Sequence, residues 1–179
     1  ATVQGHQFVV KTHFYPTRTM HLLARLGLLR TTYIYRDPRD RMLSLLEIGK
    51  RARESGETGG PFAHIATFED ALKEVQASRR HHDAWCAFPG TLIVRYEELV
   101  RDPMHELRRL RDHLRLNVME AQLEEILGRY DKKRMKSNER FTMFQKGEIG
   151  RYKQVFSSEQ VALANQALGP DLLALGYEV

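Results

Sequence analysis

The stretch Thr31–Leu46, TTYIYRDPRDRMLSLL, decides the fold. It begins with a β-branched and aromatic run, TTYIY, which is typical of a buried strand. Asp37 and Pro38 follow Arg36 directly. Aspartate is a favoured N-cap, and proline suits the first position of a helix. The sequence therefore predicts a strand that ends at Arg36 and passes at once into a helix.

The rest of the chain repeats this alternation of short strands and amphipathic helices. Two further apolar runs are predicted as strands, and two capping-box patterns mark helix starts. Strands that alternate with helices favour an α/β fold with a parallel sheet flanked by helices. The predicted strands are 7–11, 31–35 and 91–95, and the predicted helices are 20–29, 37–53, 67–87, 103–115, 118–129 and 157–168.

Composition places the chain among globular domains of ordinary size. Of its 179 residues, 42% are hydrophobic and 28% charged, a composition that argues against a disordered or fibrous chain. No run approaches the ~18 apolar residues of a membrane span, and the first residues do not predict a secretory leader. A single cysteine, Cys86, excludes an internal disulfide framework and indicates a reducing environment. The net charge of +5 favours an anionic ligand, whether nucleotide phosphate, nucleic acid or a lipid surface.

Arg36 lies where ligands bind in parallel sheets, at the carboxyl end of a strand. The free N–H groups of the following helix attract a phosphate, and an arginine can bind a phosphate with two parallel hydrogen bonds. Ser44 lies seven residues beyond Asp37, on nearly the same helix face two turns on. These features make the strand end a candidate phosphate site. The alternative is an arginine that caps neighbouring carbonyl groups beside a solvated helix face.

Lys11, Thr12 and His13 end the first predicted strand. A neutral imidazole can take a proton from a hydroxyl group, so His13 is a candidate general base at the edge of the sheet. The alternative is a loop histidine held by a hydrogen bond.

The segment 145–150, QKGEIG, is a second candidate for anion binding. Its two glycines lie in a basic stretch and would let the backbone approach an anion closely. A surface turn is the alternative interpretation of this segment.

Two other patterns favour structural over functional interpretations. His82 and Cys86 are four residues apart on a predicted helix, but no third ligand is spaced to join them, so no metal site is expected. The basic stretch 132–140 lacks the regular aromatic platform on which nucleic-acid bases stack.

Taken together and in this order, these segments resemble the soluble sulfotransferase family. Its members move a sulfuryl group from 3′-phosphoadenosine 5′-phosphosulfate (PAPS) to a hydroxyl or amine. The segment Tyr33–Ser44, YIYRDPRDRMLS, is similar to the family's 3′-phosphate motif, R-[ND]-P-x-D-x-x-x-S, and keeps its arginine-to-serine spacing. Leu92–Pro103, LIVRYEELVRDP, is similar to the family's strand followed by RYEDL. The similarity runs from about Lys11 to Phe156.

The ends of the matching region carry two more motifs. Lys11–His13 resembles the KTH segment that holds the family's catalytic base, and Phe144–Lys153, FQKGEIGRYK, resembles the late RKGxxGxW motif that closes over the nucleotide. The resemblance implies that His13 is the general base and that Lys11 stabilises charge on the transferring group. It also implies a cofactor site with Tyr96 near the adenine and the 3′-phosphate held by Arg36, Ser44, Gln145, Lys146 and Gly147.

Three departures from the family pattern have consequences. The family begins with a strand and a phosphosulfate-binding loop that contains a lysine, and the ten residues before Lys11 are too few for both. Gln145 stands where the family has arginine, and Tyr152 where it has tryptophan, so one charged phosphate contact becomes neutral and a weaker cofactor affinity is expected. The family's dimer signature is not reproduced at 153–162, so that dimer is not expected.

The resemblance implies a P-loop-NTPase-like parallel sheet flanked by helices, in one sulfotransferase-like domain over residues 1–179 that lacks its N-terminal strand and phosphosulfate loop. It implies PAPS as co-substrate, adenosine 3′,5′-bisphosphate (PAP) as product and no metal. The expected partner is a small-molecule hydroxyl or amine acceptor, with no nucleic acid and no membrane span, in the cytoplasm. Two alternatives stay open: an inactive 3′-phosphoadenosine-binding module, and a basic nucleic-acid-binding domain, whose binding would depend steeply on salt.

Overall fold

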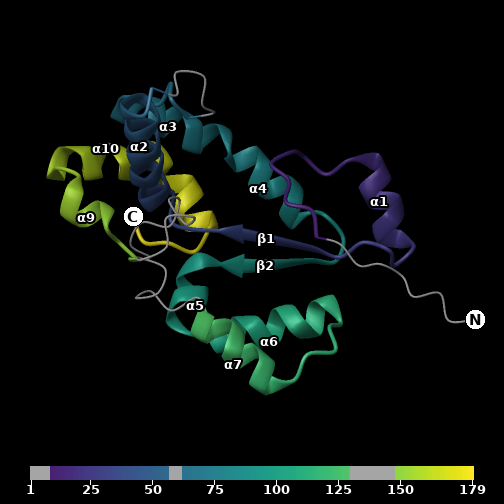
Figure 1. Cartoon of the computed structure of the whole chain (residues 1–179). Helices are drawn as coiled ribbons and strands as arrows, with labels where there is room; N and C mark the ends of the chain where they lie inside the picture. The colour runs from purple at the N-terminus through teal and green to yellow at the C-terminus, as the bar shows by residue number, and fades with distance from the viewer. Residues whose placement is uncertain (1–8, 57–61, 130–147) are drawn as a thin grey trace, which may run out of the picture.

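The computed structural model describes residues 9–56, 62–129 and 148–179 (Figure 1). Within these residues, β1 (Thr31–Tyr35) and β2 (Thr91–Arg95) pair as parallel strands, with Thr31 opposite Thr91 and Tyr35 opposite Arg95. Helices lie on both sides of the strands, so the described part has the predicted α/β architecture. Because the strands are parallel and in register, their carboxyl ends meet at one edge of the sheet.

The strands predicted at 31–35 and 91–95 are confirmed, but the strand predicted at 7–11 is wrong for the residues that the structure describes. Residues 9–11 form no strand, and Val9 is 97% exposed. The chain that follows is held by a helix instead, because the indole N–H of Trp85 donates to the carbonyl oxygen of Phe14 at 3.2 Å. Residues 9–11 therefore pair with no strand in the described part of the chain, although a strand needs a neighbouring backbone.

The helices follow the predicted pattern with shifted ends. The helix α4 (Arg79–Cys86) contacts both strands on one side, while α5 (Tyr96–Arg101) and α6 (Pro103–Leu114) contact β2 on the other (Figure 1). The short helices α5 and α9 were not predicted. In chain order the helices are α1 (Arg18–Arg25), α2 (Pro38–Glu54), α3 (Phe68–Ala77), α4 (Arg79–Cys86), α5 (Tyr96–Arg101), α6 (Pro103–Leu114), α7 (Glu120–Arg129), α9 (Tyr152–Val155) and α10 (Ser158–Ala174).

Side chains at the helix starts explain most of these boundaries. Asp37 caps α2 by accepting a hydrogen bond from the N–H of Arg39 at 2.9 Å. The predicted capping boxes are present at Thr67 and at Ser157. The helix predicted over 67–87 is instead two helices, α3 and α4, that meet at Ser78. The Ser78 hydroxyl donates to the carbonyl of Val75 at 2.6 Å, and such a bond competes with regular helix geometry.

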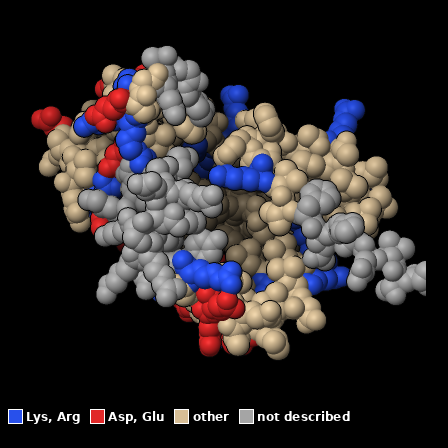
Figure 2. Space-filling model, in the orientation of Figure 1, with Lys and Arg blue, Asp and Glu red and all other residues tan. Residues whose placement is uncertain are grey.

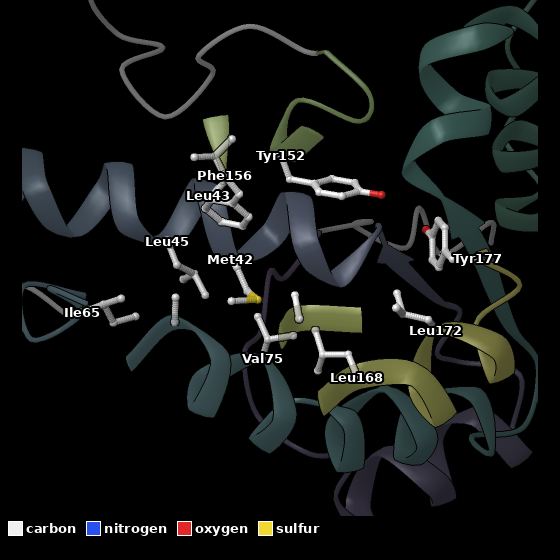
Figure 3. Packing of buried hydrophobic residues seen from close by; sticks show 12 residues of the cluster. Met42, Leu43, Leu45, Ile65, Val75, Tyr152, Phe156, Leu168, Leu172 and Tyr177 are labelled. Atoms are coloured by element: carbon white, nitrogen blue, oxygen red, sulfur yellow. The ribbon is translucent and has the colours of Figure 1, made fainter. Parts of the chain in front are cut away.

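The core lies between α2, α3 and α10 and fixes the position of α2 (Figure 3). The helix α10 continues through Pro170 to Ala174, beyond the predicted end at 168, because Leu172 is buried in this core together with Leu168. Among the described residues, no helix is long and apolar enough to cross a bilayer. The core side chains labelled in Figure 3 are Met42, Leu43, Leu45, Ile65, Val75, Tyr152, Phe156, Leu168, Leu172 and Tyr177.

One glycine permits the close approach of α2 to the chain before α3. A Cβ atom at Gly49 would lie 2.3 Å from the carbonyl oxygen of Ile65 and 2.8 Å from that of Phe62. Arg53, one turn further along α2, donates to the carbonyl oxygens of Ala63 at 2.9 Å and Ile65 at 2.7 Å. The helix and this connection are therefore in direct backbone contact.

Candidate functional site

Three of the predicted site residues meet at the carboxyl edge of the sheet. Arg36 directly follows β1, and its Nη1 donates to the Oγ of Ser44 on α2 at 3.0 Å. Tyr96 is the first residue of α5, and the centre of its ring lies 4.8 Å from the Cζ of Arg36. The parallel pairing of β1 with β2 brings Tyr96 to this place, because both strands end at the same edge.

The Arg36 guanidinium keeps capacity for an anion. Its side chain is 25% exposed, and its Nε is buried without a hydrogen-bond partner among the described residues. No hydrogen bond from Arg36 to a carbonyl group is found in that part of the chain, which disfavours the carbonyl-capping alternative. Burial raises the pKa of the Tyr96 phenol more than the neighbouring Arg36 lowers it, so the ring stays uncharged at neutral pH.

Asp40 links Arg36 to a distant segment of the chain. Its carboxylate is 1% exposed, and its Oδ2 lies 3.5 Å from Nη2 of Arg36. The same Oδ2 accepts a hydrogen bond from the N–H of Gly150 at 2.7 Å, while Oδ1 accepts one from the N–H of Tyr152 at 3.0 Å. The end of the late glycine motif, at Gly150 and Tyr152, is therefore bound beside Arg36.

A second buried carboxylate, Glu97, holds the neighbouring elements together. It is 2% exposed and accepts hydrogen bonds from the N–H of Asp37 at 3.0 Å and from the hydroxyl of Tyr177 at 2.8 Å. Its Oε2 also lies 3.4 Å from Nε of Arg95. Burial and the hydrogen bond to Glu97 raise the pKa of the Tyr177 phenol well above its usual range. Glu97 thus fixes the start of α2 against the end of β2.

The burial of Asp40 and Glu97, and their role in holding these elements together, were not predicted from the sequence. Charged residues are ordinarily exposed, and only the tertiary partners of these two carboxylates make their burial tolerable. The available signal was their position, since Asp40 lies between Arg36 and Ser44 on the first turn of a helix, and Glu97 directly follows Tyr96.

The other predicted residues are not brought to Arg36 by any contact in the described part of the chain. Lys11 and His13 are exposed, and neither has a hydrogen bond or ion pair with a described residue. The segment that carries them is held near α4 (Figure 1). Gln145, Lys146 and Gly147 lie outside the described residues.

The surface has a hollow on one face, and the fold forms a cavity beside the end of the sheet. On the face that Figure 2 shows, Lys and Arg side chains border a hollow, in keeping with the positive net charge. A cavity of about 660 Å³ lies between the end of the sheet and α10. It is lined in part by Arg39, Arg95, Tyr152 and Tyr177, but not by Arg36, Ser44 or Tyr96. The cavity and the arginine site therefore share an edge of the sheet without being the same site.

His82 and Cys86 contact each other on α4. Cys86 Sγ lies 3.2 Å from Nε2 of His82, and the His82 ring packs edge-on against Tyr33 and Tyr35. Burial raises the pKa of the Cys86 thiol and lowers the pKa of His82. No group of three metal-ligating side chains exists within the ranges that the structure describes.

Comparison with solved structures gives the fold. The chain is similar to retinol dehydratase in complex with androsterone and the inactive cofactor PAP, with 18% identity and a TM-score of 0.63 over 87% of this chain and 50% of that one. It is also similar to mouse sulfotransferase SULT7A1 complexed with PAP, with 18% identity and a TM-score of 0.66 over 83% of this chain and 61% of that one. The chain thus spans about half to three fifths of the length of these proteins.

The family follows from the sequence comparison. No curated protein matches the chain significantly. A family model described as "Sulfotransferase domain" matches residues 4–172, which is nearly the whole chain. The matched region contains the strand end at Arg36, the helix with Ser44 and the late segment at Gly150. The chain belongs to the sulfotransferase domain family.

Proposed function

We propose that this chain binds the 3′-phosphoadenosine part of PAPS. We propose further that it acts as a sulfotransferase, which transfers the sulfuryl group of PAPS to a hydroxyl or amine acceptor. The observation that carries the proposal is the meeting of Arg36, Ser44 and Tyr96 at the carboxyl edge of two parallel strands. The solved neighbours with PAP support the ligand class. The neighbours in complex with androsterone or retinol support a small-molecule acceptor.

The residues at the strand end fit a phosphate group. The guanidinium of Arg36 is partly exposed, and its Nη1 already donates to the Ser44 oxygen, which leaves the hydroxyl hydrogen of Ser44 free to point to an anion. Hydrogen bonds to a charged group contribute about 1.5–3 kcal/mol each. The flat ring of Tyr96 offers a stacking surface for a purine base at the same edge.

The proposal also assigns Gln145, Lys146 and the backbone at Gly147 to the 3′-phosphate. Gly150 follows Gly147 by three residues, and Asp40 holds it beside the Arg36 guanidinium. This attachment supports the assignment. It would give the phosphate a cation from each of two distant parts of the chain.

The transfer step is proposed as a direct in-line displacement. Bound PAPS supplies an activated sulfuryl group. His13 takes the proton of the acceptor hydroxyl as that oxygen forms a bond to sulfur. The bond between sulfur and the 5′-phosphate oxygen breaks, and its electron pair leaves on PAP. Lys11 stabilises negative charge on the transferring group, while Arg36 and Ser44 hold the nucleotide in position.

Calorimetric titration of PAP into the chain tests the binding part of the proposal. We expect Arg36→Ala to lose about 10- to 150-fold in affinity, as the loss of a charged hydrogen-bond donor implies. Arg30→Ala is the matched control, because Arg30 lies before the opposite end of β1 and donates to the carbonyl of His113. Equal PAP affinity in the Arg36→Ala variant and the parent chain would refute the phosphate site.

Two further measurements separate the proposal from its alternatives. A long polyanion titrated at several salt concentrations should bind weakly, whereas a nucleic-acid-binding domain would prefer it to PAP and show a steep salt dependence. Acceptor sulfation by the full-length protein distinguishes an enzyme from an inactive binding module. His13→Ala should then lose turnover while it keeps PAP binding. Near-normal turnover in that variant would remove His13 from the role of base.

A further inference from the structure

We infer that Asp40 is a positioning residue that couples the Arg36 guanidinium to the backbone of residues 150–152. The inference deepens the proposed function, on which it rests for the identity of the ligand. It assigns to Asp40 no contact with the nucleotide. Its role is to keep the two sides of the phosphate site at a fixed separation.

The geometry of Asp40 leaves little freedom for either side. One carboxylate oxygen is shared between the N–H of Gly150 at 2.7 Å and Nη2 of Arg36 at 3.5 Å. The other oxygen accepts the N–H of Tyr152 at 3.0 Å. Two backbone N–H donors and one guanidinium nitrogen therefore surround one carboxylate that is 1% exposed.

The surrounding packing supports this role. Asp40 lies in the first turn of α2, whose position is set by Met42 and Leu43 in the core. Tyr152 is itself buried, and its ring lies 4.5 Å from the Cζ of Arg39. The carboxylate thus lies between two elements that are anchored in the core, and a change of its charge would act on both Arg36 and the 150–152 backbone.

An amide cannot replace this carboxylate. The side chain of Asn has one acceptor oxygen and a donating NH₂ group. In Asp40→Asn, either Gly150 or Tyr152 would face a donor instead of an acceptor, and Arg36 would lose its anionic partner. We therefore expect Arg36 to adopt other orientations and the 150–152 backbone to open more often.

The matched control is Glu106→Gln. Glu106 is also a buried carboxylate, 2% exposed, and its two oxygens accept hydrogen bonds from Nη1 of Arg109 at 2.7 Å. It lies on α6, away from Arg36 and from residues 150–152. It has a comparable burial and an arginine partner, so it reports the general effect of neutralising a buried acid.

The test combines amide hydrogen exchange with two nucleotide titrations of the same full chain. Asp40→Asn should speed exchange at Gly150 and Tyr152 about tenfold or more. It should lower PAP affinity about tenfold or more, because the 3′-phosphate needs an oriented Arg36. Affinity for adenosine 5′-phosphate, which lacks the 3′-phosphate, should stay within about twofold. Glu106→Gln should change none of these quantities.

Arg36→Gln examines the coupling without any ligand. Because Arg36 neutralises the buried Asp40 carboxylate, its removal should speed exchange at Gly150 and Tyr152. Unchanged exchange there, or an equal loss of affinity for both nucleotides in Asp40→Asn, would overturn the inference. If the parent chain shows no preference for PAP over adenosine 5′-phosphate, the proposed function fails, and the exchange in Arg36→Gln still decides whether Asp40 couples the two segments.

Discussion

Replacing Gly49 with alanine sets two effects of opposite sign against each other. In a helix interior, alanine is favoured over glycine by about 1 kcal/mol, so propensity alone predicts a more stable protein. The structure predicts the reverse, because the new Cβ would lie 2.3 Å from the carbonyl oxygen of Ile65 and 2.8 Å from that of Phe62. Both obstacles are backbone atoms, and Arg53 hydrogen-bonds the Ile65 oxygen at 2.7 Å, so they resist displacement.

Overpacking of this kind costs about 1–3 kcal/mol, and the severity of the 2.3 Å contact favours the upper part of that range. After the propensity gain, we expect Gly49→Ala to lower the free energy of unfolding by about 1–2 kcal/mol. For a chain of this size each kcal/mol lowers the melting temperature by about 2–4 °C. Urea denaturation followed by circular dichroism measures the change directly.

Gly128→Ala is the matched control, because Gly128 is also helical and a Cβ there would meet no described heavy atom within 4 Å. It should raise the free energy of unfolding by up to about 1 kcal/mol. If both variants are more stable than the parent chain, the close backbone approach at Gly49 is refuted. If Gly128→Ala is destabilised as well, helix propensity does not set the sign of the change even where no described heavy atom lies within 4 Å of the new Cβ, and the predicted gain is refuted.

Three further predictions concern titratable groups. The raised pKa of Tyr177 stabilises the fold below the ordinary tyrosine pKa of about 10, and this stability is lost as pH rises beyond it. Tyr177→Phe should therefore make the melting temperature between about pH 9 and 11 less sensitive to pH, and an unchanged slope would contradict the burial of that phenol. The lowered pKa of His82 means that acid favours the unfolded chain below about pH 6.5, so His82→Gln should lose less stability than the parent between pH 7 and about pH 5. The raised pKa of Cys86 predicts slower alkylation by iodoacetamide at about pH 8 than for a cysteine in a short peptide, and an equal or faster rate would count against it.

Local signals were enough for the centre of the fold. The run TTYIY and the pair Asp37-Pro38 each carry their own preference for strand or helix start, and the structure has both at the predicted places. The contact between Arg36 and Ser44 follows from their spacing in the sequence, because a strand end and two helical turns have fixed geometry.

Features that depend on tertiary partners could not be predicted from local patterns. Val9 and Val10 look like strand residues, yet whether they form one depends on a neighbouring backbone. The break at Ser78 depends on a side-chain bond to Val75. The burial of Asp40 depends on N–H groups that lie far along the chain, which no periodicity in α2 encodes.

The links that build the arginine site join residues far apart in sequence. The hydrogen bond from Asp37 to Glu97 spans 60 residues, and that from Gly150 to Asp40 spans 110. Closing such long loops costs chain entropy, so these contacts form only when the domain as a whole is folded. A nucleotide bound at this site would stabilise the folded state against the unfolded chain, and the melting temperature would rise as the nucleotide concentration increases. The thermal shift on adding PAP is thus a direct measure of whether the entire fold, and not a local loop, creates the site.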